Sequence, residues 1–226
     1  MYNKKRVVLT MGISHLIALE DYSVNQWNNL IEIASDIKNN LNNYKNCLNN
    51  KILASLFFEP STRTMLSFQS AFLKLGGQVI GFDNSASSSL SKGEDIADTI
   101  RVVSTYSDVI VVRHPIEGAC KFASLYSKVP LINAGDGSHL HPTQTLTDLL
   151  TIKSEQGRLD NLTIGICGDL RHARTVHSII KALSCYENNK IFLISTKELI
   201  LPNYIKDYLI NKNIILEEVT TIEECI

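Results

Sequence analysis

The feature that most constrains the fold of this 226-residue chain is a regular alternation of short apolar runs with longer amphipathic stretches. Short runs rich in Val, Ile and Leu are typical of buried parallel strands, and the stretches between them repeat apolar residues at helical spacing. This alternation predicts βαβ units and a mostly parallel sheet. Strands are expected at residues 51–58, 77–82, 108–114, 129–135, 163–170, 190–196 and 213–220.

Helices are expected between these strands. A helix over 64–76 would place four apolar side chains on one face and end at Gly76, and a helix over 141–157 would begin with Pro142 at its favoured first position. The four apolar side chains are Met65, Phe68, Phe72 and Leu75. The other helices are expected at residues 16–41, 92–106, 118–127, 174–186 and 201–212, and the asparagine-rich stretch 39–51 is expected to be a surface turn.

The strand and helix pattern restarts after "GRLDNL" at residues 157–162, which divides the chain into two halves. The pattern predicts two doubly wound α/β domains with parallel sheets, over residues 1–145 and 146–226. The second half holds only three predicted strands, which is small for a domain that closes its own sheet. We therefore expect it to be either a minimal domain or an incomplete one.

Composition excludes several classes of function. The net charge is −1, so there is no electrostatic case for a nucleic acid or a membrane surface as partner. No signal peptide or membrane-spanning run is predicted. The five cysteines are scattered without CxxC spacing and the six histidines form no metal-binding pattern, which favours a reducing cytoplasm and argues against a metal site.

The stretch "FFEPSTRT" at residues 57–64 places a polar cluster at the carboxyl end of a predicted buried strand. The following helix begins there, so its free backbone N–H groups and its dipole favour an anion. Ser61, Thr62 and Thr64 add hydroxyl donors, and Arg63 adds a planar guanidinium matched to phosphate oxygens. This pattern predicts a phosphate site; the alternative is a plain helix cap by Ser61 or Thr62 with Arg63 in solvent.

Further polar residues follow other strands of the same predicted sheet, at the edge where open α/β sheets bind ligands. Arg113 ends the strand "VIVVRH", where pairing with a surface carboxylate is the alternative, and His114 is expected to pack or orient rather than react. In "HPTQ", His141 can donate to a carbonyl oxygen that gains charge, or simply cap the helix. Gln144, one turn later, suits an amide-like group.

Two more segments carry candidate anion-binding residues. The stretch "SASSSLSKGED" at residues 85–95 has Lys92 and Gly93 before a helix, which suggests a mobile loop closing on an anion or else an exposed linker. In "GDLRHARTVHS", Gly168 and Asp169 end a strand and Arg174 and Thr175 begin a helix. A substrate carboxylate would suit Arg174, and the absence of GxGxxG argues against a dinucleotide.

Taken in order, these motifs resemble the catalytic chain of the aspartate carbamoyltransferase family. The resemblance runs from the first predicted strand to about residue 180. It is carried by "FFEPSTRT", "SSLSKGEDIADT", "VVRHPIEGA", "NAGDGSHLHPTQTLTDLLTI", "GRLDNL" and "GDLRHARTVHS". Ornithine carbamoyltransferases share the first and fourth of these elements, whereas "SKGE" and "GDLxxxRTVHS" favour the aspartate enzyme.

The resemblance implies transfer of the carbamoyl group of carbamoyl phosphate to the α-amine of L-aspartate, in pyrimidine synthesis, without a metal or an organic cofactor. The residues that it implies to bind the phosphate are Ser61, Thr62, Arg63 and Thr64. Arg113 and His141, with Thr64, would polarise the carbamoyl carbonyl and stabilise the oxyanion. Gln144 would hold the carbamoyl amine.

The aspartate would be bound by Arg174 and Thr175, according to the same resemblance. Ser89 and Lys92 correspond to a loop that reaches into a neighbouring subunit's site, where Lys92 would serve both substrates and the catalytic step. This implies a homotrimer with shared active sites, and it leaves the attachment of a regulatory chain open. Ser88 and Ser89 are ambiguous by one position.

Several positions depart from the family pattern. Met65 stands where an arginine is usual, Gln69 where a glutamate is usual, and His172 where some relatives have tyrosine. The C-terminal part of the family's second domain has no counterpart in the sequence. We therefore expect the chain to bind carbamoyl phosphate better than aspartate, and two alternatives stay open: a non-catalytic relative that binds or assembles only, and an ornithine carbamoyltransferase.

Overall fold

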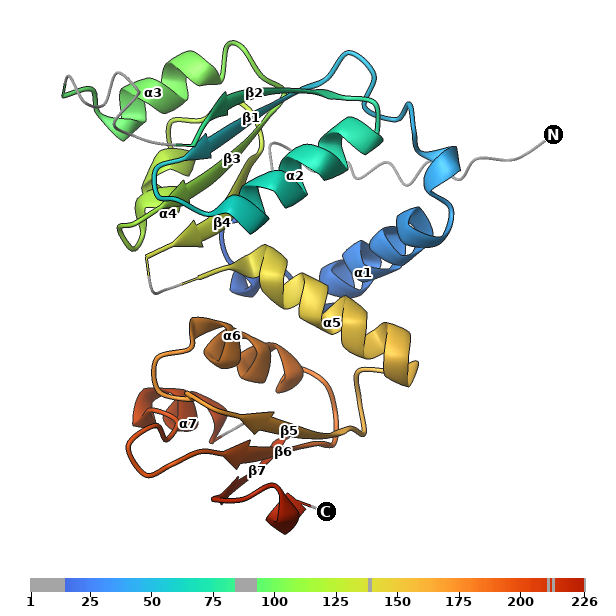
Figure 1. The fold of residues 1–226 in the computed structure, drawn as a ribbon, viewed down its shortest axis with the longest axis vertical. Coiled ribbons are helices and arrows are strands. Elements are labelled where there is room, and N and C mark those ends of the chain that lie inside the picture. The colour runs from blue at the N-terminus through green and yellow to red at the C-terminus, as the bar shows by residue number, and fades with distance from the viewer. Residues whose placement is uncertain (1–14, 84–92, 138–139, 211, 213, 226) are drawn as a thin grey trace.

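The computed structural model describes residues 15–83, 93–137, 140–210, 212 and 214–225 and shows two parallel sheets with helices around them (Figure 1). The first sheet has the order β2-β1-β3-β4 and the second β5-β6-β7. The strands are β1 (Ile52–Phe57), β2 (Gln78–Phe82), β3 (Val109–His114), β4 (Leu131–Asp136), β5 (Thr163–Cys167), β6 (Asn189–Ile194) and β7 (Ile214–Val219). The α-helices are α1 (Val24–Asn39), α2 (Thr62–Lys74), α3 (Ile96–Val103), α4 (Ala119–Ser124), α5 (Pro142–Gln156), α6 (Arg174–Leu183) and α7 (Asn203–Leu209). The predicted α/β class with parallel sheets is confirmed.

The first sheet is covered on both faces because its strands alternate their side chains between two helical layers. Leu53 and Phe57 of β1 pack against the apolar face of α2. Ala54 and Leu56 point the other way, into a cluster that includes Ile100 of α3 and residues of α4. Gly76 follows α2 with a φ of +92°, which a side chain would resist, so the predicted helix end at this glycine is confirmed.

The first long helix begins later than the sequence predicted. The expected start at Leu16 is wrong, because α1 begins at Val24 after a capping box between Ser23 and Gln26. Leu16 instead forms a parallel bridge with Ile132 at the edge of β4. The asparagine-rich stretch after α1 is a short 3-10 helix, Leu41–Asn43, followed by turns.

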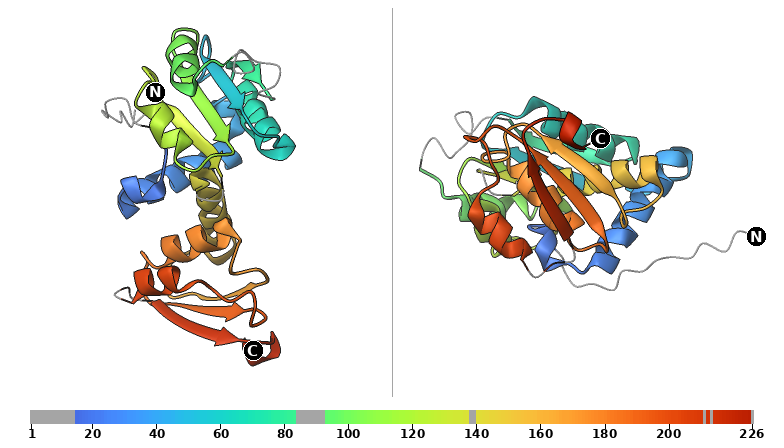
Figure 2. Two further views of the ribbon diagram at one scale, coloured as in Figure 1. Left: turned by 90° about the vertical axis from the view of Figure 1, so that its left-hand side faces the viewer. Right: turned by 90° about the horizontal axis from the view of Figure 1, so that it is seen from below.

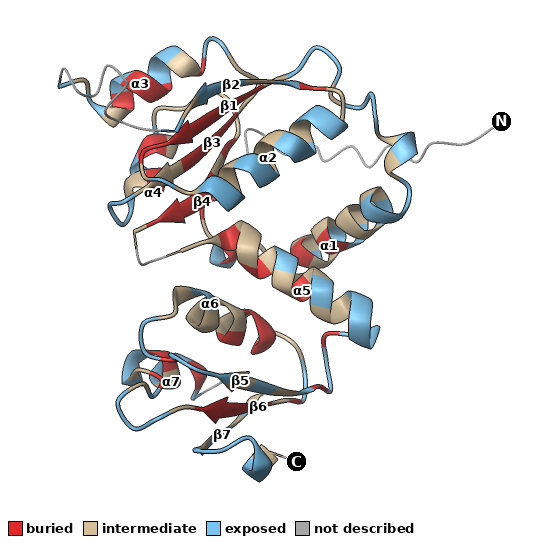
Figure 3. Cartoon of the chain, in the orientation of Figure 1, coloured by how far each residue is buried: buried red, intermediate tan, exposed pale blue. Residues whose placement is uncertain are grey.

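In the part of the chain that the structure describes, the second sheet has helices on one face only. Ile191 and Leu193 of β6 pack toward α6 and α7, while the opposite face leaves Thr163, Gly165 and Cys167 of β5 exposed (Figure 3). Parallel sheets are normally covered on both faces. Within the described residues, the second sheet therefore has one uncovered face.

Helix α5 connects the two halves (Figure 2). It packs against α1 on one side and α6 on the other, and its Leu149 lies in one apolar cluster with Trp27 and Ile180. The predicted domain boundary at residue 145 falls inside this helix and stays a prediction. Within the described residues, no helix has the length and apolarity to cross a membrane.

Candidate active site

The candidate site lies where the carboxyl ends of β1, β3 and β4 meet at one edge of the first sheet. All pairs in this sheet are parallel, so the segments that follow these strands leave from the same edge. A cavity of about 430 Å³ opens there. It is lined by Ser61, Arg63, Thr64, Arg113, His141, Gln144, Arg174 and Thr175.

The β1–α2 turn presents its donors without using them internally. Ser61 occupies the N-cap position of α2 but makes no side-chain cap hydrogen bond, so the alternative of a plain capping role by Ser61 is not what the structure shows. The first backbone bond of the helix is from the Met65 N–H to the Ser61 carbonyl, at 3.0 Å. Within the described part of the chain, Arg63 forms neither an ion pair nor a hydrogen bond, and its guanidinium lies at the cavity.

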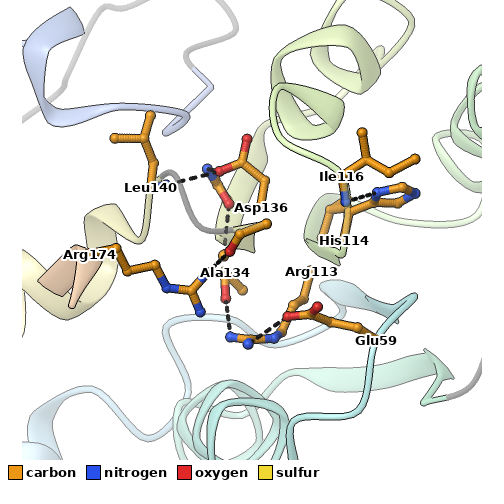
Figure 4. Close-up of polar contacts among 12 residues, drawn as sticks. Glu59, Arg113, His114, Ile116, Ala134, Asp136, Leu140 and Arg174 are labelled. Carbon is orange, nitrogen blue, oxygen red and sulfur yellow. Dashed lines mark hydrogen bonds and ion pairs between the residues drawn. The ribbon is translucent and has the colours of Figure 1, made fainter. Parts of the chain in front are cut away.

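Arg113 is a largely enclosed cation of the site, with 13% of its side chain exposed. One end of its guanidinium meets the carboxylate of Glu59 at 2.6 Å, and Nη1 donates to the Ala134 carbonyl at 3.2 Å (Figure 4). Its Nε is buried and has no partner among the described residues. The carboxylate pairing that the sequence left as an alternative thus occurs, but at the cavity and not on the outer surface.

Gly135 allows this close approach of Arg113 to β4. Its φ is +118°, and a Cβ there would lie 2.9 Å from Nη1 of Arg113. A side chain at this position would meet both backbone strain and the guanidinium, so glycine is required to let Arg113 lie along the strand end.

His141 enters the site as the residue before Pro142, at the N-cap of α5 and without a capping bond. Burial, followed by the positive charges of Arg113 and Arg174, lowers the pKa of His141 to about 4. The imidazole is therefore neutral near pH 7. Its Nδ1 lies 3.3 Å from the Thr143 hydroxyl, and a bond donated by that hydroxyl would leave the Nε2–H free to donate.

Gln144 lies one turn into α5, on the same cavity as His141. Its Nε2 donates to the Asp148 carboxylate at 2.9 Å, which fixes the orientation of the amide. The pKa of Asp148 is raised, because burial outweighs this hydrogen bond. The Gln144 carbonyl oxygen accepts no bond within the described residues, so it remains able to accept one from a ligand N–H.

Arg174 and Thr175 bring the second half of the chain to the same cavity. Arg174 begins α6, and its Nη1 donates to the Gly137 carbonyl from the first half. Burial and then the charge of Arg113 lower the pKa of Arg174, while the carboxylates of Glu59 and Asp136 oppose this. The two arginines repel one another across the cavity, which makes it suited to an anion.

A second, more open cavity of about 590 Å³ adjoins the first. Its lining residues are Glu59, Pro115, Gly137, His172, Ala173, Arg174 and Thr175. Asp169 holds the turn before α6, since its carboxylate accepts the backbone N–H groups of Arg171 and His172 at 3.1 and 2.9 Å. Arg174 and Thr175 are thus shared between the two cavities.

The remaining predicted residues have different outcomes. Ser88, Ser89 and Lys92 lie outside the described residues. The ring of His114 packs against the ring of Phe58, with 5.1 Å between the ring centres, and its Nδ1 accepts the Ile116 N–H at 3.0 Å. Its expected packing role is therefore confirmed. Within the described ranges, no group of three or more His, Cys, Asp or Glu side chains is placed to hold a metal ion.

The two departures on α2 are accommodated below the helix. Met65 packs against the core of the first sheet, and Gln69 donates to the buried Ser55 hydroxyl at 3.4 Å. Neither side chain lines the cavity of about 430 Å³. These two departures therefore lie outside the lining of the cavity.

Comparison with known proteins places the chain in a family. Residues 14–154 match the aspartate/ornithine carbamoyltransferase carbamoyl-P binding domain. The chain is 56% identical over 211 residues to the aspartate carbamoyltransferase catalytic subunit of Clostridium perfringens, covering 93% of this chain and 69% of that protein. This chain belongs to the aspartate/ornithine carbamoyltransferase family. The corresponding subunit of Finegoldia magna is 57% identical over 212 residues, covering 94% of this chain and 69% of that protein.

Solved structures agree with this family and with its fold. The M. jannaschii aspartate transcarbamoylase catalytic subunit superposes with a TM-score of 0.89 at 48% identity, over 93% of this chain and 69% of that one. The Trypanosoma cruzi aspartate transcarbamoylase, solved with carbamoyl phosphate and aspartate, superposes with a TM-score of 0.83 at 38% identity. The match covers 91% of this chain and 70% of that one. This member of the carbamoyltransferase family thus has the family's fold over the described residues.

The sequence of this carbamoyltransferase family member did not predict three residues at the site. Glu59 pairs with Arg113, Thr143 contacts His141, and Asp136 lies buried beneath the cavity. Glu59 carried a signal, since it is an acid between an apolar strand and Pro60. The other two gave none, because their contacts depend on how β4 and α5 meet.

Proposed function

We propose that this chain binds carbamoyl phosphate in the cavity of about 430 Å³ and transfers the carbamoyl group to the α-amine of L-aspartate, giving N-carbamoyl-L-aspartate and phosphate. The observation that carries this proposal is the convergence of eight predicted polar residues from four separate segments on one cavity. Relatives named for this activity, and one relative solved with both substrates, support the same reaction.

The phosphate would be held at the start of α2. The helix N-terminus, the hydroxyls of Ser61 and Thr64 and the guanidinium of Arg63 supply donors at the cavity. These donors also stabilise the leaving group, because phosphate gains negative charge as the carbamoyl C–O bond breaks. Thr62 begins α2 but is exposed and is not part of the cavity lining, so its role in phosphate binding stays a prediction.

The carbamoyl group would lie between Arg113 and His141. The aspartate amine attacks the carbamoyl carbon, and the developing oxyanion accepts hydrogen bonds from Arg113, Thr64 and the neutral His141. Gln144 would accept a bond from the carbamoyl NH₂ through its free carbonyl oxygen. The C–N bond forms, the C–O bond to phosphate breaks, and the amine proton leaves to phosphate or solvent. Holding both reactants in one orientation supplies much of the rate enhancement.

The aspartate would occupy the adjoining cavity, with a carboxylate on Arg174 and a hydrogen bond from Thr175. Lys92 would complete this site and contact carbamoyl phosphate, with Ser89 beside it, from a neighbouring copy of the chain. We therefore propose a homotrimer with shared sites. A cytoplasmic location, proposed from the scattered cysteines, and a role in pyrimidine synthesis accompany this function.

The direct test is production of carbamoyl-aspartate by the purified 226-residue chain, alongside a version extended to the length of its relatives. We expect the extended version to turn over. Carbamoylation of ornithine in place of aspartate would contradict the proposal. Light scattering on the same samples tests the trimer, and a monomeric mass with full activity would contradict shared sites.

A second candidate is a module that binds carbamoyl phosphate without turnover. One observation favours it: among the described residues, Arg174 and Thr175 are the only predicted aspartate ligands at the cavities, whereas six predicted residues line the side proposed for carbamoyl phosphate. Calorimetry separates the two candidates, because a binding module would bind carbamoyl phosphate while both the given and the extended chains fail to form product.

A further inference from the structure

Asp136 is a carboxylate buried beneath the site, with 1% of its surface exposed. Its Oδ2 accepts the Gly118 N–H at 3.0 Å, and its Oδ1 accepts the Leu140 N–H at 3.3 Å and the Asn133 amide at 3.1 Å. No ion pair to Asp136 is formed within the described ranges. The carboxylate therefore serves as an acceptor for three N–H groups from three segments.

Asn133 extends this network to the N-terminal segment. Its side chain is fully buried, its Nδ2 also donates to the Ile17 carbonyl at 3.1 Å, and its Oδ1 accepts the Gly135 N–H at 2.8 Å. Together the two side chains tie residue 17, the turn after β3, the end of β4 and the approach to α5. The bonds of Asn133 are buried, and the bonds that Asp136 accepts from Gly118 and Leu140 are partly buried. The Asp136 and Asn133 side chains are themselves buried, so the loss of a bond leaves a buried polar group without a partner.

Residues 134–137 and 140, which these two side chains hold, bond to both arginines of the cavity or directly precede its imidazole; Figure 4 shows the contacts of Arg113 and Arg174. Arg113 donates to the Ala134 carbonyl, and Arg174 donates to the Gly137 carbonyl. His141 directly follows Leu140, whose N–H is bound by Asp136. The relative placement of two arginines and the imidazole therefore depends on one buried network.

We propose that Asp136 and Asn133 are positioning residues for the anion site: they set residues 134–137 and 140–141 so that Arg113, His141 and Arg174 converge on one ligand. This inference rests on the proposed function for the identity of the ligand. Neither side chain lines the cavity. Both act through the backbone groups that they hold, since a site needs its polar groups placed to within a fraction of an ångström.

Charge and position predict opposite effects for one variant. Burial lowers the pKa of both Arg174 and His114, and the negative charge of Asp136 opposes that lowering at both side chains. If only this charge mattered, Asp136→Asn would tighten anion binding. If Asp136 positions residues 134–137 and 140–141, the new amide NH₂ faces backbone N–H groups, these residues move, and anion binding weakens.

The test measures by calorimetry the affinity of the whole 226-residue chain and of each variant for inorganic phosphate. The unfolding temperature of each variant is measured alongside, to show that it is folded. We expect Asp136→Asn to weaken phosphate binding about tenfold or more, as loss of about 1.4 kcal/mol of well-placed hydrogen bonding would do. The matched control is Asn189→Ala. Asn189 is also fully buried and bonds to the Leu159 and Leu183 carbonyls, but it lies in the second sheet.

The control should lower the unfolding temperature and leave phosphate affinity unchanged. Unchanged or tighter phosphate binding by folded Asp136→Asn would overturn the inference. If that variant does not fold, Asn133→Ser takes its place, because it removes the bonds to Ile17 and Asp136. It should also weaken phosphate binding, and unchanged affinity in that variant would overturn the inference equally.

A second readout separates this inference from the proposed function. The imidazole NMR resonances of His141 in ligand-free protein report its surroundings without any substrate. They should shift in Asp136→Asn and stay unchanged in Asn189→Ala. Resonances that do not move in Asp136→Asn would contradict positioning, whereas wild-type protein that fails to bind phosphate would contradict the proposed function.

Discussion

At the scale of single residues, Arg63 is the cation of the site that the described chain leaves without a partner. We expect Arg63→Ala to weaken carbamoyl phosphate binding by about 2 kcal/mol or more, because a charge-assisted bond to phosphate is lost. Calorimetry measures this directly. Arg158→Ala is the control, since Arg158 is exposed and lies away from the cavity. Equal affinities of the two variants would show that Arg63 does not touch the ligand.

Glu59 competes with a ligand for Arg113, because their ion pair must open before Arg113 can turn to an anion. We expect Glu59→Gln to tighten inorganic phosphate binding by about 1 kcal/mol, through loss of that competition and of a negative charge. Competition calorimetry at constant ionic strength measures the change. The control is Asp98→Asn, which removes a negative charge from the exposed side of α3. Weaker binding by Glu59→Gln would mean that Glu59 orients Arg113 instead of competing for it.

His141 should be neutral across the physiological range, because its pKa is lowered to about 4 from its ordinary 6.5. Its stabilising contribution is fully present above pH 6.5 and is lost as pH falls toward 4, since the unfolded chain then binds a proton that the folded chain resists. Denaturant unfolding at pH 7 and pH 5 measures this. His141→Gln should lose less stability than wild type over that interval. An NMR titration that gives the His141 imidazole a pKa near 6.5 in the ligand-free protein would contradict this prediction.

At the scale of elements, two serines occupy N-caps but differ in what they bond. Ser23 completes a capping box at α1, whereas Ser61 at α2 makes no cap bond. We expect Ser23→Ala to cost about 1 kcal/mol of unfolding free energy. Ser61→Ala should change stability little and weaken phosphate binding. The reverse pattern, from denaturant unfolding and calorimetry on both variants, would show that Ser61 is a structural cap.

At the scale of the whole molecule, one apolar cluster joins the two halves. Leu149 of α5 is fully buried in it, together with Trp27 and Ile180 from the two halves. We expect Leu149→Ala to lower the unfolding free energy by about 2–5 kcal/mol. Trp27 is the sole tryptophan, so its fluorescence reports this cluster.

Unfolding followed by Trp27 fluorescence and by circular dichroism should coincide in the wild-type chain, since the cluster couples both halves. The control is Leu73→Ala on α2, where the side chain is 57% exposed and stability should barely change. Two separate transitions in the wild type would mean that the halves unfold independently.

The positions of most strands and helices could be predicted from the sequence, because the spacing of apolar residues reports which side chains are buried locally. The runs around Leu53 and Val111 gave buried strands, and Gly76 and Pro142 marked helix ends, since these depend on neighbours along the chain. The start of α1 could not be predicted from the sequence in this way. Leu16 is apolar at helical spacing, yet its pairing with Ile132 at the edge of β4 outweighs helix formation, and that partner is distant in sequence.

Site residues divide in the same way. Arg63, Arg113 and His141 were predictable because each lies at the carboxyl end of a strand or at the start of a helix, and parallel strands bring such positions to one edge. The convergence of these residues on one cavity could therefore be inferred from the sequence. The pairing of Glu59 with Arg113 and the burial of Asp136 beneath the cavity became known from the folded chain alone. These contacts depend on how separate segments pack, and local patterns carry no information about which distant group fills a given space.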